Sequence, residues 1–90
     1  MAVHMVSYDL IKRKNYPELH GALQTYPYWH CLDSTWIVVT GKTAMELCTE
    51  LLRHVDADDK ILVTELTGQA AWSRSFDQNC QDWLSGNLGR

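Results

Sequence analysis

The chain has 90 residues, which suffice for one hydrophobic core and are too few for two ordinary domains. Hydrophobic residues make up 46% of it and charged residues 21%, which indicates a globular protein and excludes a disordered one. The formal net charge of −3 argues against an overall basic surface for nucleic acid, although a local basic patch stays open.

Three cysteines, Cys31, Cys48 and Cys80, are far apart in the sequence and odd in number. They suit neither a disulfide framework nor a paired-cysteine metal clamp, which favours a reducing compartment. No apolar run approaches the roughly 20 residues that span a bilayer, so we expect no membrane association. A soluble, cytoplasmic protein is therefore expected.

The first strand is predicted over residues 2–9, whose β-branched and aromatic content is typical of a mostly buried strand. A short basic loop follows at residues 11–15. Pro17 suits the first position of a helix, and Glu18 suits the positive end of the helix dipole. Helical spacing of apolar residues then predicts a helix that ends before Pro27.

A β-hairpin is predicted next. Residues 28–32 and 35–40 are rich in residues that favour strands, and Asp33 with Ser34 supplies the turn between them. The second helix is the clearest element, because Thr43 and Glu46 have the spacing of a capping box. Behind the box runs a full apolar stripe: Ala44, Leu47, Cys48, Leu51, Leu52 and Val55.

The last part of the chain supplies a fourth strand and an extension. Residues 56–59 form an acidic run that we interpret as a solvated turn, because it lacks the spacing of a calcium-binding loop. Residues 61–66 form the strand. The core is thus predicted over residues 1–68, and residues 69–90 extend the same domain with an edge strand at 70–72 and a short helix ending near Leu84.

The order of these elements is βαββαβ, which predicts an α+β, ferredoxin-like fold with a four-stranded antiparallel sheet and two helices on one face. Two helices cover only one face of such a sheet, so the other face is solvated or buried by a partner. Apolar residues on both faces of the first strand and exposed tail aromatics such as Trp72 favour a homodimer through the open face.

Four features at these positions resemble the small ferredoxin-like nuclease superfamily. They are the strand ending Val6-Ser7-Tyr8-Asp9, the hairpin segment Ser34-Thr35-Trp36, the helix after Thr43 and the strand 61–66. That superfamily includes the CRISPR-associated adaptation endonuclease that partners the integrase, and virulence-associated protein D. One departure is Leu32, which stands where a glutamine is common shortly before the hairpin serine.

The resemblance implies a site as well as a fold. Asp9 inherits the role of the aspartate that each protomer contributes near the dimer axis, where the two carboxylates hold Mg²⁺ or Mn²⁺. Such hard cations take oxygen ligands and activate water beside a phosphodiester. Around Asp9, the expected phosphate-binding residues are Lys12, Arg13 and Lys14, and the expected supporting residues are Tyr8, His30 and Ser34.

Simpler interpretations of the same residues stay open. Asp9 is also a suitable cap for the turn after its strand, the basic loop suits a solvated surface, and His30 suits an outer face. The four histidines lack metal-ligand spacing, which argues against zinc. The aromatic cluster either stacks unpaired bases or packs in a core or dimer interface; it comprises Tyr26, Tyr28, Trp29 and Trp36.

The sequence is therefore consistent with three functional hypotheses. The first is a homodimeric, metal-dependent endonuclease that acts on RNA or DNA with Asp9 as the metal ligand. The second is a non-catalytic dimeric module that binds a protein or nucleic-acid partner. The third is a ferredoxin-like regulator that binds a small molecule, for which no residue names the ligand.

Overall fold

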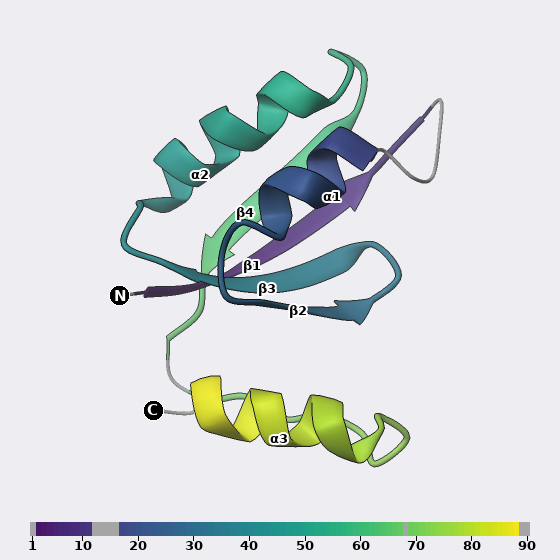
Figure 1. The fold of residues 1–90 in the computed structure, drawn as a ribbon, viewed down its shortest axis with the longest axis vertical. Coiled ribbons are helices and arrows are strands. Elements are labelled where there is room, and N and C mark those ends of the chain that lie inside the picture. The colour runs from purple at the N-terminus through teal and green to yellow at the C-terminus, as the bar shows by residue number, and fades with distance from the viewer. Residues whose placement is uncertain (1, 12–16, 68, 89–90) are drawn as a thin grey trace.

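The computed structural model describes residues 2–11, 17–67 and 69–88, and it has the α+β fold predicted from the sequence (Figure 1). The order βαββαβ is confirmed, and a third helix follows it. In chain order the elements are β1 (Ala2–Asp9), α1 (Pro17–Leu23), β2 (Tyr28–Leu32), β3 (Thr35–Thr40), α2 (Ala44–Leu51), a 3₁₀ turn (Leu52–His54), β4 (Lys60–Glu65) and α3 (Gln78–Asn87).

The four strands form one antiparallel sheet in the order β2-β3-β1-β4, so β2 and β4 are its edges. Val6 of β1 lies opposite Trp36 of β3 on one side and Val63 of β4 on the other. Because side chains alternate along a strand, this register puts all three on the same face of the sheet. That face carries α1 and α2 (Figure 1).

The main core lies between this face and the two helices. Its strand residues are fully or almost fully buried, and each helix contributes two leucines that are 0% exposed. Burial of a side chain of this size contributes about 1.5–3 kcal/mol, so the helices are held mainly by this layer. The buried members are Val6, Tyr8, Leu19, Leu23, Trp36, Val38, Leu47 and Leu51.

The capping box predicted before α2 is confirmed. The hydroxyl of Thr43 accepts from the backbone N–H of Glu46 at 3.1 Å, and the Thr43 N–H donates to the Glu46 carboxylate at 2.9 Å. These bonds satisfy two backbone donors that would otherwise lack partners at the start of the helix. By contrast, α1 ends at Leu23, earlier than the predicted end before Pro27.

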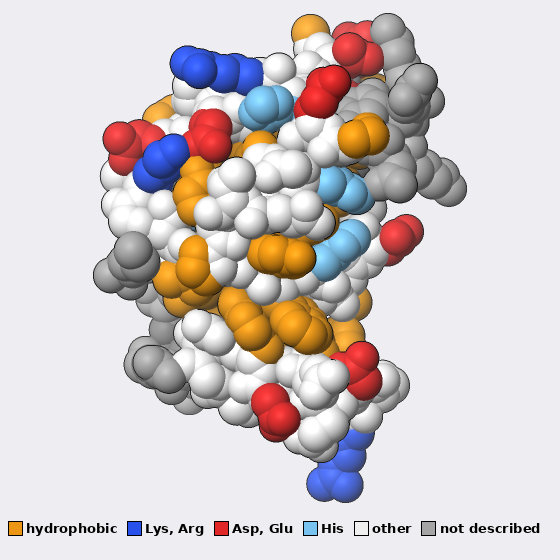
Figure 2. All heavy atoms as spheres, viewed as in Figure 1, with side chains coloured by type: hydrophobic (Ala, Val, Ile, Leu, Met, Phe, Trp, Pro, Cys, Tyr) orange, Lys and Arg blue, Asp and Glu red, His pale blue; other side chains and the backbone are white. Residues whose placement is uncertain are grey.

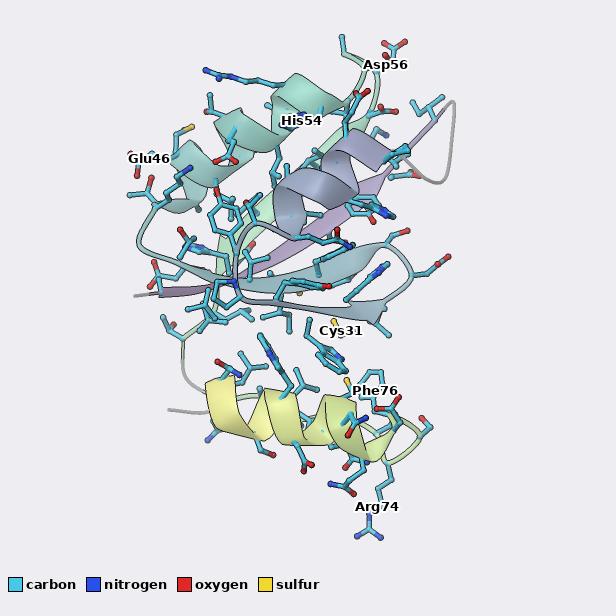
Figure 3. All side chains as sticks on the ribbon, viewed as in Figure 1. Cys31, Glu46, His54, Asp56, Arg74 and Phe76 are labelled. Atoms are coloured by element: carbon cyan, nitrogen blue, oxygen red, sulfur yellow. The ribbon has the colours of Figure 1, made fainter. Side chains whose placement is uncertain are left out.

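A second core covers part of the other face of the sheet. Ile37 of β3 is buried there against Cys80 and Leu84 of α3, and Trp29 of β2 stacks on Trp83 with ring centroids 6.3 Å apart. Figure 2 shows hydrophobic side chains gathered between the sheet and α3. In Figure 3, Cys31 of β2 points toward this layer, and Phe76 lies on its α3 side. The tail of the chain thus forms a third layer.

The edge strand predicted at residues 70–72 is wrong. Among the described residues, none between 66 and 77 belongs to a strand. Ala70 and Ala71 are exposed, and only Trp72 packs against the second core. The apolar run therefore reflects one anchoring ring rather than a paired backbone, and Trp72 is not the exposed aromatic expected from the sequence. The short helix predicted in the tail corresponds to α3.

The third layer reduces the area of the open sheet face on which a partner could bind. The second core includes residues of β2 and β3 and, at one end of the sheet, Val3 of β1 and Leu66, whereas Met5, Ser7, Leu62 and Thr64 lie on the same face of β1 and β4 outside it. Leu62 is 61% exposed. Within the described ranges, the part of β1 and β4 around Met5 and Leu62 lies outside the core that α3 covers. Among the described residues, no helix is long and apolar enough to cross a membrane.

The first prediction concerns the second core. Leu84→Ala should lower the free energy of unfolding by about 2–5 kcal/mol, because Leu84 is 3% exposed and its truncation leaves a cavity between α3 and the sheet. Urea denaturation followed by circular dichroism measures the change. The matched control is Leu52→Ala, since Leu52 is 48% exposed and should change stability little. Equal stability of wild type and Leu84→Ala would contradict the third layer.

Candidate functional site

Asp9 is the last residue of β1, and it is exposed. It lies opposite Lys60 of β4 in the sheet register. Alternation along β1 puts Tyr8 in the main core and directs Asp9 to the opposite face, the one that also carries Ser7. Asp9 and Lys60 line one shallow pocket. Sequence reasoning selected Asp9 but missed Lys60, which the chain brings beside it only through strand pairing.

The turn between β2 and β3 meets the end of β1. The backbone N–H of Tyr8 donates to the carbonyl of Ser34 at 3.0 Å, which fixes the turn beside the residue that follows Tyr8. A small cavity of about 150 Å³ results, lined by Asp9, Leu10, Asp33 and Ser34. Two carboxylates and one hydroxyl-bearing residue therefore share one cavity.

This set of donors fits a hard divalent cation. Mg²⁺ is usually held by one or two carboxylates, with water and substrate phosphate oxygens completing its coordination. Asp9 and Asp33 supply two such carboxylates, and Ser34 supplies a further oxygen. Within the described part of the chain, no group of three or more His, Cys, Asp or Glu residues is arranged to hold a metal. One copy of the chain thus offers a partial set of ligands.

Tyr8 contributes to the site through its backbone, because its side chain belongs to the core. Its hydroxyl accepts from the indole N–H of Trp36 at 3.0 Å and lies 3.3 Å from Nε2 of His20. Since the indole can only donate, the Tyr8 proton is available to His20. Burial is the main cause that raises the pKa of Tyr8, while its bond to Trp36 opposes that rise. The phenol therefore stays protonated at neutral pH.

His30 lies next to the cavity and is engaged in the turn. Its Nε2 is 2.9 Å from the carbonyl of Asp33, and because a carbonyl only accepts, this nitrogen carries the proton and donates it. The ring stacks on Trp36, and the ring of His20 meets it edge-on with centroids 5.7 Å apart. Burial, and then the proximity of His30, lower the pKa of His20. A neutral His20 is consistent with its bond to Tyr8.

The predicted phosphate-binding residues Lys12, Arg13 and Lys14 lie outside the described residues. The segment that leads toward them is fixed by Asp59. Its carboxylate accepts from the backbone N–H of Ile11 at 2.8 Å and from the N–H of Asp56 at 2.9 Å. The chain is therefore anchored two residues after Asp9.

Asp59 corrects the expectation that residues 56–59 form a solvated turn. Asp56 and Asp58 are exposed, but Asp59 is only 7% exposed. The carboxylate is buried because it satisfies two backbone donors, one of them 48 positions away in the sequence. No local pattern distinguishes Asp59 from its acidic neighbours. Asp33, by contrast, directly precedes Ser34, which was predicted as a supporting residue. The turn formed by these two residues was therefore a local signal from which Asp33 could have been predicted as well.

Comparison with known protein families adds no assignment, because the chain matches no family model. Support for a function therefore comes from the arrangement of Asp9, Asp33, Ser34 and Lys60 and from the resemblance described above.

The second prediction concerns Asp59. Asp59→Asn should lower the free energy of unfolding by about 1–3 kcal/mol, because an amide has only one accepting oxygen for the two partly buried N–H groups. Thermal and urea denaturation measure the loss. Asp58→Asn is the matched control, since Asp58 is exposed in the same turn. If both variants lose the same stability, the effect comes from the charge of the turn and not from the anchoring of Ile11.

Proposed function

We propose that this protein is a homodimeric, metal-dependent endonuclease that cleaves phosphodiester bonds of RNA or DNA, with Asp9 as a metal ligand. The observation that carries the proposal is the cavity shared by Asp9, Asp33 and Ser34 at the end of β1. The resemblance of Tyr8-Asp9 and of the hairpin segment to the ferredoxin-like nuclease superfamily supports it independently.

The chemistry follows from the residues around the cavity. Bound Mg²⁺ or Mn²⁺ activates water and neutralises charge on the phosphodiester. Asp9 and Asp33 would hold the cation, and the Ser34 hydroxyl would donate to a phosphate oxygen. Lys60, on the strand beside Asp9, pairs with a neighbouring phosphate as a point charge, and the basic loop of residues 12–14 guides the rest of the backbone.

The homodimer is proposed on the part of the β1–β4 face around Met5 and Leu62, which lies outside the second core. Leu62 and Met5 supply apolar area there, and Asp9 lies at the end of the same face. A second copy docked on this part of the face contributes its own Asp9 near the first, which adds the carboxylate that one copy lacks. A symmetric interface of this kind uses the same patch on both partners.

A second candidate is a non-catalytic dimeric module of the same fold that binds a protein or nucleic-acid partner. One specific observation favours it. Both histidines near the cavity are engaged internally, since Nε2 of His30 donates to Asp33 and Nε2 of His20 is paired with Tyr8. These contacts leave neither Nε2 atom free to act as a general base.

The third prediction tests the endonuclease. Asp9→Asn should reduce cleavage on the order of 100-fold or more, because a neutral amide is a far weaker ligand for Mg²⁺ and the metal contributes several kcal/mol to phosphoryl-transfer transition states. Asp33→Asn should raise the Mg²⁺ concentration needed for half-maximal rate. Cleavage of labelled single-stranded RNA and double-stranded DNA is measured in Mg²⁺ and in Mn²⁺.

Asp58→Asn serves as the control, because Asp58 is an exposed carboxylate of the same charge in another turn. All variants are purified identically, and their folding is compared by circular dichroism. Cleavage that persists in Asp9→Asn, or is missing from the wild type under both metals, refutes the endonuclease and leaves the binding module as the preferred function.

The fourth prediction tests the dimer. Leu62→Glu should convert a dimer into a monomer in sedimentation velocity, because it places a charge in the centre of the proposed apolar interface. Leu52→Glu is the control, since Leu52 is exposed after α2 on the other side of the sheet. A wild-type protein that sediments as a monomer at all concentrations tested would rule out this interface.

A further inference from the structure

Edge strand β2 carries a layer of rings on the side of the sheet that faces α1. Trp36 lies beneath this layer and is 1% exposed. The ring of His30 stacks on it almost in parallel, with centroids 4.1 Å apart and an interplanar angle of 16°. Tyr28 packs on the same indole at 5.1 Å. In Figure 2, histidine and hydrophobic side chains lie together on the visible face of the molecule.

The other aromatic residues of this region are occupied by internal contacts. Trp29 stacks on Trp83 in the second core, and Trp36 is buried. The Tyr26 hydroxyl bonds to Glu50 and to Lys42. The sequence left open whether the four aromatic residues of the cluster stack bases or pack in a core or interface. For three of them, Tyr26, Trp29 and Trp36, these contacts show packing within the chain.

Tyr28 and His30 differ from those residues because both are exposed, Tyr28 at 37% of its surface. They occupy alternate positions of one strand, so their side chains lie on the same face. Trp36 beneath them is itself fixed, because its indole N–H donates to Tyr8. The hydrogen bond from His30 to the Asp33 carbonyl likewise fixes the His30 ring above Trp36. Because the rings of Trp36 and His30 are already fixed, they lose little conformational entropy when a ligand stacks on His30.

We propose that Tyr28 and His30 form a stacking surface for the unpaired bases of a single-stranded nucleic acid. The inference rests on the proposed function and names its substrate class. Every base has a π-face that stacks on aromatic rings without regard to sequence, and in a duplex those faces are already occupied by neighbouring bases. The surface therefore selects single strands over duplexes.

The surface is joined to the cavity by the turn that follows β2. The backbone carbonyl of Asp33 accepts a hydrogen bond from His30, and Asp33 also lines the cavity with Asp9. In this proposal, a strand with one base on His30 has a phosphate next to that base within reach of the cavity. The stacking surface holds one nucleotide of the strand, whatever its base. The cavity then determines which neighbouring phosphodiester bond is attacked.

The fifth prediction separates stacking from simple apolar contact. Fluorescence anisotropy of labelled single-stranded DNA and RNA oligonucleotides is measured with the wild-type protein in EDTA, so that binding is read without cleavage. Tyr28→Leu should weaken binding on the order of tenfold, whereas Tyr28→Phe, which keeps the π-face, should bind like wild type. His30→Leu should weaken binding similarly, and a duplex of the same sequence should bind more weakly than either single strand.

His54→Leu is the matched control for His30→Leu, because His54 lies beyond α2, away from β2, and should leave binding unchanged. Urea denaturation checks that each variant keeps its fold. Equal losses for Tyr28→Leu and Tyr28→Phe, duplex binding as tight as single-strand binding, or no binding of single strands would each overturn the proposal.

The same variants distinguish failure of this inference from failure of the endonuclease. Binding that depends on Tyr28, in a protein that never cleaves, supports the stacking surface and refutes the nuclease. Cleavage that depends on Asp9 but is equal in wild type, Tyr28→Leu and His30→Leu supports the nuclease and overturns the stacking surface. An apolar peptide is tested in the same assay. If it binds wild type and Tyr28→Leu equally well and displaces no oligonucleotide from wild type, these rings are not the binding site of an apolar partner.

Discussion

Burial of β3 on both faces is the constraint on which the structure depends. Trp36 and Val38 of this strand point into one core, and Ile37 points into the other, with all three 5% exposed or less. A strand apolar on both faces requires a layer on each side of the sheet. Helices α1 and α2 supply one layer, and α3 with the tail before it supplies the other. The C-terminal residues are consequently part of the same cooperative unit as the sheet.

The candidate site depends on the register that this packing enforces. Tyr8 must face the main core and meet Ser34 through its backbone, and only then does the next residue, Asp9, reach the cavity beside Asp33. A slip of one residue between β1 and β3 would exchange the faces, burying Asp9 and exposing Tyr8. The cost of burying that carboxylate opposes such a slip. The position of Asp9 is therefore fixed by core residues that have no chemical role.

The elements with local signals were the ones that sequence reasoning predicted. The capping box of Thr43 and Glu46 and the apolar stripe behind it involve neighbours on one helix, so α2 was predicted closely. The contact of Asp59 with Ile11 spans 48 positions and has no local signature, and the same holds for Lys60 beside Asp9. The edge strand was predicted from the apolar run Ala70, Ala71 and Trp72, of which only Trp72 packs against the second core, without strand pairing. The tail helix was predicted, but its place over the sheet was not.

Helix α1 is short, and two rings of β2 stay exposed. At about 1.5 Å per residue, the 7 residues of α1 make a helix of roughly 10 Å, and the chain then turns through backbone bonds from Thr25 and Tyr26 to residues 22 and 23. Of the residues of α1, His20 meets the ring of His30 edge-on, and both Tyr28 and His30 stay exposed. An edge strand pairs with other chains through its backbone N–H and C=O groups, so a ligand stacked on these rings would leave that route to aggregation open.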